Sequence, residues 1–353
     1  AALNGAWEKV IKQIEENDQL SLLYDIEMPL SKVLSSMEVT GFLVDRESIQ
    51  QYGAVLEEKI NSLVSEIYDL AGEEFNINSP KQLGTILFEK LRLPAKKKTK
   101  SGYSTNADVL ESLAPDYPIV SLILEYRTLA KLKSTYCDGL QKCIAPDGRI
   151  SSTEPNLQNI PVRTPVGREL RKFFIAKDGC VLVDADYSQI ELRVLSDIAN
   201  DETMISAFNN GDDIHTITAS QVFNMPVETV TPLMRSRAKA VNFGIVYGIG
   251  AFSLAHDIGV TRAEADKYIK GYLHHFSGVD SYMKNVIARA KEDGYVQTLF
   301  KRRRYLPELT ASNAMIRNFG ERVARNMPIQ GTAADIIKIA MVRVYDRLEK
   351  ENL

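Results

Sequence analysis

Residues 235–248 read RSRAKAVNFGIVYG and carry four large side chains at intervals of four: Arg235, Lys239, Phe243 and Tyr247. A helix over this stretch places two cations and two aromatic rings along one face, and two glycines among them allow close approach. Cations can hold phosphates while a ring stacks on a base, so this face suits a nucleoside triphosphate. An amphipathic helix with buried rings and solvated cations is the alternative, but four side chains in register favour the binding face.

A second informative stretch, residues 179–199, reads GCVLVDADYSQIELRVLSDIA. The apolar run 180–183 predicts a β-strand, and the spacing of apolar residues over 190–198 predicts a helix. Asp186 therefore lies near the carboxyl end of the strand, where a carboxylate can hold Mg²⁺. Asp184 faces the same side by strand alternation, so the two carboxylates could form a two-metal site, or Asp184 could be a chance polar residue. Spacing alone does not decide between these.

The composition narrows the class of protein. A chain of 353 residues with 44% hydrophobic residues can form two or three domains. The three cysteines, Cys137, Cys143 and Cys180, form no CxxC pair, which argues against a zinc site or a disulfide framework and indicates a reducing compartment. No stretch has the length of a membrane span and the first residues do not resemble a signal peptide. These features predict a soluble, cytoplasmic protein.

The charge is unevenly distributed, although the net charge is only −3. Residues 281–330 hold ten Lys and Arg against four Asp and Glu. Most of these cations come from the quartet Lys301–Arg304 and from the stretch that carries Arg317, Arg322 and Arg325. Such a stripe can neutralise a phosphate backbone, or it can be a solvated helix face.

Long helical periodicities dominate residues 29–145, and they predict an elongated helical domain. Within it, Asn78 or Ser79 caps a helix that begins at Pro80. After residues 146–148 the pattern changes to shorter runs with β-branched residues.

Several motifs resemble those of the family A DNA polymerases, most closely the bacterial members. DYSQIELR and RSRAKAVNFGIVYG are similar to the family's motifs A and B. The resemblance extends to SSTEPNLQNIPVR, GDDIHTITASQVF, YLPEL and ERVARNMPIQGTAADIIK, so it covers nearly the whole chain. It identifies the chain as the C-terminal polymerase portion of such an enzyme.

The resemblance implies a helix-rich α+β fold shaped as a right hand with thumb, palm and fingers. The implied division is a tail of an exonuclease-like domain (1–27), a thumb (28–146), a first palm segment (147–199), fingers (200–295) and a second palm segment (296–353). The last segment is truncated before motif C.

The resemblance also assigns roles to residues. Asp186 is implied to be catalytic and to hold a metal ion together with the backbone carbonyl of Tyr187. The implied nucleotide-binding residues are Gln189, Glu191, His215, Arg235, Lys239, Phe243 and Tyr247. Among them, Glu191 matches a steric gate against the ribose 2′-hydroxyl, although it could also be a helix N-terminal acid favoured by the helix dipole.

DNA-binding residues are implied on both palm segments. Arg322, Asn326 and Gln330 recur every four residues and are expected to contact the minor groove of primer–template DNA. Asn156, Gln158 and Arg163 resemble contacts to the template or structural residues of the palm.

The chain departs from the family pattern in two places. Ile150 is followed directly by Ser151, where relatives carry a hairpin ending in Thr-Gly-Arg-Leu. The sequence also ends at Leu353, before the family's His-Asp-Glu hairpin, whose aspartate is the second catalytic carboxylate. The pair His256–Asp257 is followed by Ile258 and lies in the fingers, so we interpret it as unrelated. Four explanations fit this difference. The sequence could contain only the ordered or retained residues of a longer polymerase, another chain could complete a split enzyme, catalysis could be lost, or Asp184 could replace the second carboxylate.

The resemblance implies an enzyme, a DNA-directed DNA polymerase (a nucleotidyltransferase), that uses two Mg²⁺ ions. It would add deoxynucleotides to a primer 3′-hydroxyl under the direction of a template. The implied partners are primer–template DNA and deoxynucleoside triphosphates, and no membrane is involved. The protein is expected to be a monomer in the cytoplasm, associated with the nucleoid. The alternatives are a noncatalytic or split fragment that binds primer–template DNA, and a relative of the single-subunit RNA polymerases. The RNA polymerases carry Tyr in place of Phe243 and lack the Glu191 gate.

Overall fold

The computed structural model describes residues 2–95, 98–99, 102–143, 149–150, 156–161 and 164–352, which form two compact units. One unit, Ser36–Asp184, is called the helical unit here. The other, called the discontinuous unit, combines Ala1–Ser35 with Ala185–Leu353. Across the described ranges, we find no helix with both the length and the apolar character needed to cross a membrane.

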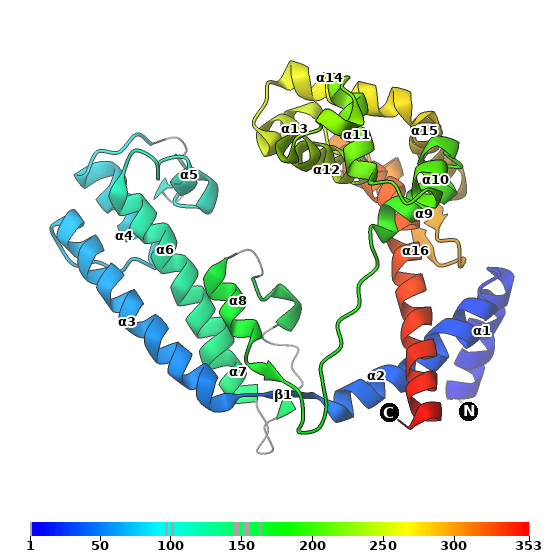
Figure 1. The fold of residues 1–353 in the computed structure, drawn as a ribbon, viewed down its shortest axis with the longest axis horizontal. Coiled ribbons are helices and arrows are strands. Elements are labelled where there is room, and N and C mark those ends of the chain that lie inside the picture. The colour runs from blue at the N-terminus through cyan, green and yellow to red at the C-terminus, as the bar shows by residue number, and fades with distance from the viewer. Residues whose placement is uncertain are drawn as a thin grey trace. The chain divides into compact units, whose positions relative to one another are not determined.

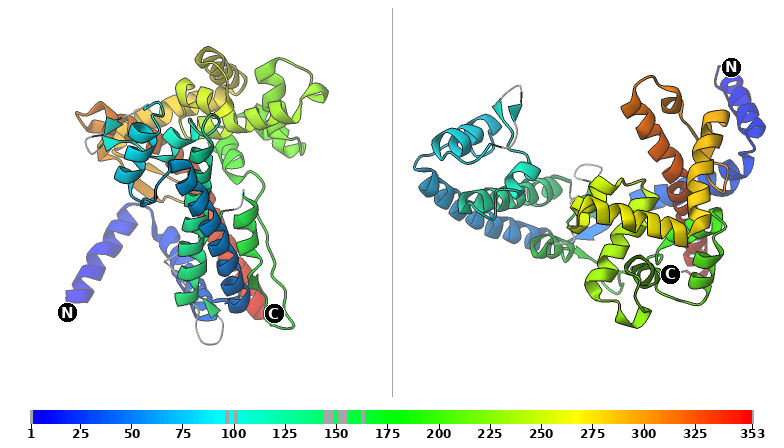
Figure 2. Two further views of the ribbon diagram at one scale, coloured as in Figure 1. Left: turned by 90° about the vertical axis from the view of Figure 1, so that its left-hand side faces the viewer. Right: turned by 90° about the horizontal axis from the view of Figure 1, so that it is seen from above.

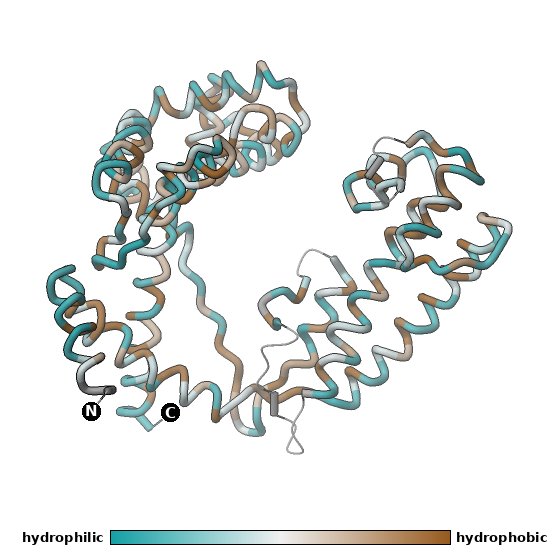
Figure 3. The backbone as a smooth tube through the Cα atoms, turned by 180° about the vertical axis from the view of Figure 1, so that it is seen from behind, coloured by the Kyte–Doolittle hydropathy of each residue, from teal (hydrophilic) through white to brown (hydrophobic). Residues whose placement is uncertain are grey.

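The helical unit is built on two long helices, α3 (Arg46–Ala71) and α6 (Pro118–Leu132), which lie side by side (Figures 1 and 2). The Asp45 side chain caps α3 by accepting a hydrogen bond from the Ser48 backbone, and Gly72 ends the helix in the left-handed conformation. Hydrophobic positions recur along both helices (Figure 3). Their buried side chains form one core with those of the shorter helices of the unit. The helices predicted within residues 29–145 are therefore present, and the compact unit that holds most of them runs from Ser36 to Asp184.

Shorter elements complete the helical unit. As predicted, Ser79 caps α4, which begins at Pro80. The further helical segments are α4 (Pro80–Gly84), the π-helices η2 (Thr85–Lys90) and η3 (Lys133–Cys137), α5 (Ala107–Glu111), α7 (Asp138–Cys143), the 3₁₀-helix η4 (Leu157–Asn159) and α8 (Pro165–Arg171).

Two small antiparallel sheets belong to this unit. In the first, β1 (Phe42–Val44) lies between β4 (Arg149–Ile150) and β5 (Phe174–Ile175), with Leu43 opposite Ile175. In the second, β2 (Lys98–Thr99) pairs with β3 (Gly102–Tyr103).

The discontinuous unit is also mainly helical. Its elements are α1 (Ala2–Glu16), the π-helix η1 (Leu22–Glu27), α2 (Met28–Thr40, which ends in the helical unit), α9 (Ile190–Ile198), α10 (Glu202–Asn209), α11 (Ile214–Phe223), the 3₁₀-helix η5 (Val227–Thr229), α12 (Pro232–Val246), α13 (Ala251–Ile258), α14 (Arg262–His275), α15 (Ser277–Asp293), the hairpin β6 (Tyr295–Gln297) and β7 (Arg303–Tyr305), the 3₁₀-helix η6 (Pro307–Thr310) and α16 (Ala314–Glu351). Helices α9 to α15 share a core around Leu192, Leu254 and Tyr272, all fully buried. The helix predicted over 190–198 is confirmed as α9.

The strand predicted over residues 180–183 is wrong. The segment between β5 and α9 is drawn as a plain tube in Figure 1, and in the described part of the chain it pairs with no strand. Val181 and Val183 are 80% and 85% exposed. A run of β-branched residues favours an extended backbone, but a β-strand exists only where a neighbour satisfies its hydrogen bonds.

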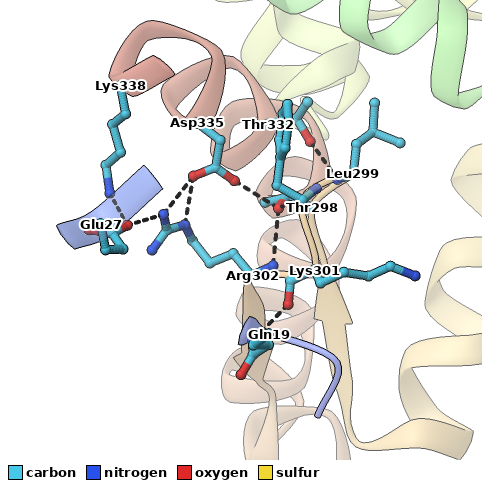
Figure 4. Close-up of polar contacts among 10 residues, drawn as sticks. Gln19, Glu27, Thr298, Leu299, Lys301, Arg302, Thr332, Asp335 and Lys338 are labelled. Carbon is cyan, nitrogen blue, oxygen red and sulfur yellow. Dashed lines mark hydrogen bonds and ion pairs between the residues drawn. The ribbon is translucent and has the colours of Figure 1, made fainter. Parts of the chain in front are cut away.

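A network of charged side chains around the buried Asp335 fastens α16 to the β6–β7 hairpin and to η1 (Figure 4). The fully buried Asp335 of α16 accepts hydrogen bonds from the Thr298 hydroxyl at 2.8 Å and from Arg302 Nε at 2.8 Å. Arg302 also pairs with Glu27, to which Lys338 donates at 2.7 Å. Burial raises the pKa of the Glu27 carboxyl, but the bonds from Lys338 and Arg302 outweigh it and hold that pKa below its usual value. Because each charged side chain of this network has a partner, the network fixes one register of the hairpin against the helix.

Candidate active site

Helix α12 contains the stretch that the sequence analysis singled out. The Thr231 side chain caps it by accepting from the Met234 backbone, and Pro232 occupies its first turn. The helix ends at Val246, and Tyr247 is its C-cap residue. Gly244 is required here, because a Cβ on it would lie 2.6 Å from Cγ2 of Ile249.

Helices α11 and α12 bring three of the predicted nucleotide-binding side chains together. The His215 ring lies 5.8 Å from the Phe243 ring, and the Lys239 ammonium lies 6.0 Å from the centre of the same ring. Arg235 Nε donates to Asp213 Oδ2 at 2.5 Å, and Arg235 stays 44% exposed. In the part of the chain that the structure describes, neither terminal nitrogen of Arg235 has a hydrogen-bond partner. The two cations therefore lie where an anion can reach them.

Titration of His215 is suppressed by its surroundings. The side chain is buried, and burial together with the charges of Arg235 and Lys239 lowers its pKa to about 4, against the opposing effect of Asp213. The ring is therefore neutral at pH 7.

Asp213 is held as a carboxylate. Burial raises the pKa of this carboxyl, but hydrogen bonds from Arg235, the Thr216 hydroxyl and the His215 backbone outweigh it and lower the pKa overall. The residue thus caps α11 and pairs with α12 at once.

Tyr247 joins two further predicted residues. Its hydroxyl donates to Glu191 Oε2 at 3.0 Å and is also hydrogen-bonded by the Gln330 amide. Burial and the neighbouring Glu191 carboxylate raise the pKa of the Tyr247 hydroxyl. This contact brings α9, the end of α12 and α16 to one place.

A groove runs along α16 beside Tyr247. It has a volume of about 420 Å³ and is lined by all three residues predicted to bind DNA on this helix, and by Arg304 of β7. Those three residues are Arg322, Asn326 and Gln330. Asn326 Oδ1 and Gln189 Oε1, the latter at the start of α9, are both buried, and neither has a hydrogen-bond partner among the described residues. Unpaired polar atoms of this kind are costly unless a ligand or water satisfies them.

The predicted metal-binding residues take part in none of the contacts described above for the site. Asp186 and Tyr187 are exposed and precede α9, and within the described ranges no hydrogen bond or ion pair joins Asp186 to the other site residues. Asp184, at the boundary of the helical unit, is exposed as well. No group of three side chains among the described residues could hold a metal ion. Arg163 and the side chain of Gln158 lie outside the described residues, and Asn156 is an exposed turn residue.

Two side chains of this site, Asp213 and Asn242, were not predicted from the sequence. Asp213 directly precedes the helical residues 214–223, and an aspartate at this position is a sequence signal for a helix N-cap. This signal could have predicted its role. Asn242, beside Phe243, is fully buried and bonds His215, and no local pattern indicates that contact.

Known proteins resemble the chain over most of its length. The profile of DNA polymerase family A matches residues 46–353. DNA polymerase I of Geobacillus stearothermophilus is 51% identical over 369 residues, which cover 100% of this chain and 42% of that protein. DNA polymerase I of Bacillus subtilis (strain 168) is 50% identical over 368 residues, again 100% of this chain and 42% of the relative.

A solved structure supports the fold. It is described as the POL domain of Pol1 from M. smegmatis in complex with DNA primer-template and dNTP, and it matches with a TM-score of 0.88 and 40% identity. The match covers 97% of this chain and 63% of that chain. The predicted helix-rich α+β class with a polymerase fold is thereby confirmed. The chain spans about two fifths of the length of these curated relatives, and on both sequence and structure it belongs to DNA polymerase family A.

Proposed function

We propose that this chain carries out template-directed DNA synthesis, adding deoxynucleotides to a primer 3′-hydroxyl as a monomer bound to primer–template DNA. The observation that carries the proposal is the cluster on α11 and α12, where His215 and Lys239 lie near the Phe243 ring and the Arg235 charge acts on His215. Tyr247, at the end of α12, lines the α16 groove. A protein with this activity would work at the nucleoid in the cytoplasm. The division into exonuclease-like tail (1–27), thumb (28–146), fingers (200–295) and two palm segments (147–199 and 296–353) belongs to the same proposal.

In the proposed reaction the primer 3′-oxygen attacks the α-phosphorus of the incoming nucleotide. A bond forms between that oxygen and phosphorus, the bond from the α-phosphorus to the bridging oxygen breaks, and pyrophosphate leaves with the electron pair. The proton of the 3′-hydroxyl passes to solvent. Arg235 and Lys239 would hold the triphosphate and stabilise the charge that develops on it, while Phe243 would lie against the sugar and base.

The oxygen donors of Asp186 and Tyr187 fit Mg²⁺, which takes one or two protein oxygens and leaves room for water and phosphates. Family A DNA polymerases generally depend on a divalent metal ion. Two bound Mg²⁺ ions would supply charge stabilisation at the attacking and leaving oxygens. The described residues contain no cluster of three possible metal ligands. The oxygen donors at Asp186 therefore fit one ion, and the second ion remains a prediction.

Discrimination between sugars is assigned to Glu191 and Tyr247. The hydrogen bond between them holds the carboxylate in one orientation, so that it can occupy the space of a ribose 2′-hydroxyl. Gln189, whose backbone turns into α9 in the left-handed conformation, would present its unpaired amide oxygen nearby.

DNA binding is assigned to the α16 groove. Arg322, Asn326 and Gln330 would reach the hydrogen-bond acceptors that all base pairs present in the minor groove, which checks pairing geometry without reading sequence. Asn156, Gln158 and Arg163 are proposed as further contacts to the template strand.

The test is primer extension by the full-length natural protein with Mg²⁺ and deoxynucleotides. Asp186→Ala should abolish extension and leave primer–template binding within about twofold, because removing one metal ligand removes charge stabilisation and not the groove. Asp184→Ala is the matched control, since it removes an exposed carboxylate two residues away. Undiminished extension by Asp186→Ala would refute the assigned role. Equal use of ribonucleotides and deoxynucleotides would favour an RNA polymerase, and DNA binding without extension by the unchanged protein would favour a scaffold.

A further inference from the structure

We propose that Asn242 is a positioning residue that fixes the proton of His215 on Nε2, so that His215 meets the triphosphate as a neutral hydrogen-bond donor. The consequence for nucleotide binding rests on the proposed function, whereas the proton position itself does not. The contacts that carry the proposal lie between α11 and α12.

Three buried side chains form a chain of hydrogen bonds. The Thr218 hydroxyl of α11 bonds Asn242 Oδ1 at 3.0 Å, and Asn242 Nδ2 lies 2.9 Å from His215 Nδ1. Thr218 and Asn242 are fully buried and His215 is 2% exposed. Water therefore does not compete for these groups.

The direction of donation follows from the hydroxyl. Among the described residues the Thr218 hydroxyl has no acceptor other than Asn242, so its single proton must point to the amide oxygen. The other end of the amide is then the NH₂ group, which can only donate. His215 Nδ1 must accept that hydrogen bond with its lone pair.

A neutral ring whose Nδ1 bears no proton must carry it on Nε2. Nε2 is also the ring nitrogen without a partner among the described residues, so it is the one left for a ligand. The charged groups acting on the ring are Asp213 from the start of α11 and Arg235 and Lys239 from α12. Helices α10 and α14 and the 3₁₀-helix η5 also pack on α11, and none of their described residues contributes a charge that acts on the ring.

A neutral donor suits this position. Arg235 and Lys239 already supply positive charge, and a third cation would be repelled by them and would vary with pH. An Nε2–H fixed by Asn242 would instead keep its hydrogen bond to a phosphate unchanged from about pH 5.5 to 8, because the ring does not titrate there.

The first test needs no catalysis. Histidine ring nitrogens labelled with ¹⁵N report the tautomer by NMR, and His215→Gln assigns the signals by removing one ring. We expect the Nε2–H form of His215, unchanged on titration from about pH 8 to 5.5. An Nδ1–H form, or protonation near pH 6.5, would overturn the proposal even in a protein that extends primers normally.

The second test changes the partner of Nδ1. In Asn242→Asp a carboxylate can only accept, so Nδ1 must carry the proton and Nε2 loses it once the ring is neutral. We therefore expect the ratio of the variant's KM for deoxynucleotide to that of the unchanged protein to rise about tenfold between pH 6 and pH 8. This is the change expected from the loss of one hydrogen bond to a charged group. In a His215→Gln background the same substitution should give no pH-dependent change.

Equal KM effects at all pH values, or the same effects without His215, would show that Asn242 only supports packing. If Asn242→Asp does not fold, Thr218→Val serves instead, because it removes the hydroxyl and keeps the shape. That variant should show mixed His215 tautomers by NMR, and an unchanged spectrum would contradict the proposal. A protein that incorporates no nucleotide at all would refute the proposed function and leave the tautomer result standing.

Discussion

At the scale of single residues, the buried His215 should make stability depend on pH. Its pKa is about 4 in the folded protein against an ordinary value of 6.5, so the unfolded chain binds more protons between these values. The stabilisation is complete above pH 6.5 and is lost as the pH falls toward 4. Its size is at most about 3 kcal/mol.

The measurement is urea unfolding of the natural protein and of His215→Gln at pH 7, 5.5 and 4.5. The natural protein should lose stability more steeply on acidification, because glutamine does not titrate. Parallel losses in the two proteins would show that His215 titrates normally in the fold.

Asp213 combines two roles that substitution can separate. Asp213→Ala removes both the cap of α11 and the ion pair with Arg235, so it should lower the free energy of unfolding by about 1 to 2 kcal/mol. Asp213→Asn keeps a capping acceptor and removes only the charge, so its cost should stay below about 1 kcal/mol. Urea unfolding at pH 7 compares them, and equal losses would mean that the charge, not the cap, dominates.

At the scale of elements, two helical glycines should respond in opposite ways to alanine. A Cβ on Gly331 of α16 would lie 2.6 Å from Thr298 Cγ2, whereas a Cβ on Gly271 of α14 meets no atom within 4 Å. Gly331→Ala should destabilise by about 1 to 3 kcal/mol through overpacking against the β6–β7 hairpin. Gly271→Ala should stabilise by up to about 1 kcal/mol, because alanine loses less backbone entropy in a helix. Thermal unfolding of the two variants checks this, and destabilisation by both would contradict it.

The sequence predicts helices and their faces well but pairings across the fold poorly. The α12 and α9 helices and the Ser79 cap follow from local spacing and capping chemistry, and the structure confirms them. The strand at 180–183 fails because its pairing depends on residues elsewhere in the chain. Asn242 was missed for the same reason, since its bond to His215 spans 27 residues. The Tyr247–Glu191 bond spans 56 residues, and only resemblance to a family suggested that both act on the nucleotide.

At the scale of the whole molecule, the two units have separate hydrophobic cores. Leu110 is fully buried in the core of the helical unit, and Leu254 is fully buried in the core formed by α9 to α15. A truncation in one core removes contacts only from that core, so its cost should be confined to one unit.

Leu110→Ala should therefore lower the stability of residues 36–184 by about 2 to 5 kcal/mol, the range for a leucine truncated in a packed core. Hydrogen exchange followed by mass spectrometry measures this, because opening of the helical unit exposes its amides and not those of residues 185–352. Leu254→Ala is the matched control, and it should accelerate exchange in the helices around α13 while the amides of α3 and α6 keep their protection. Faster exchange throughout the chain in either variant would show that the two units unfold as one.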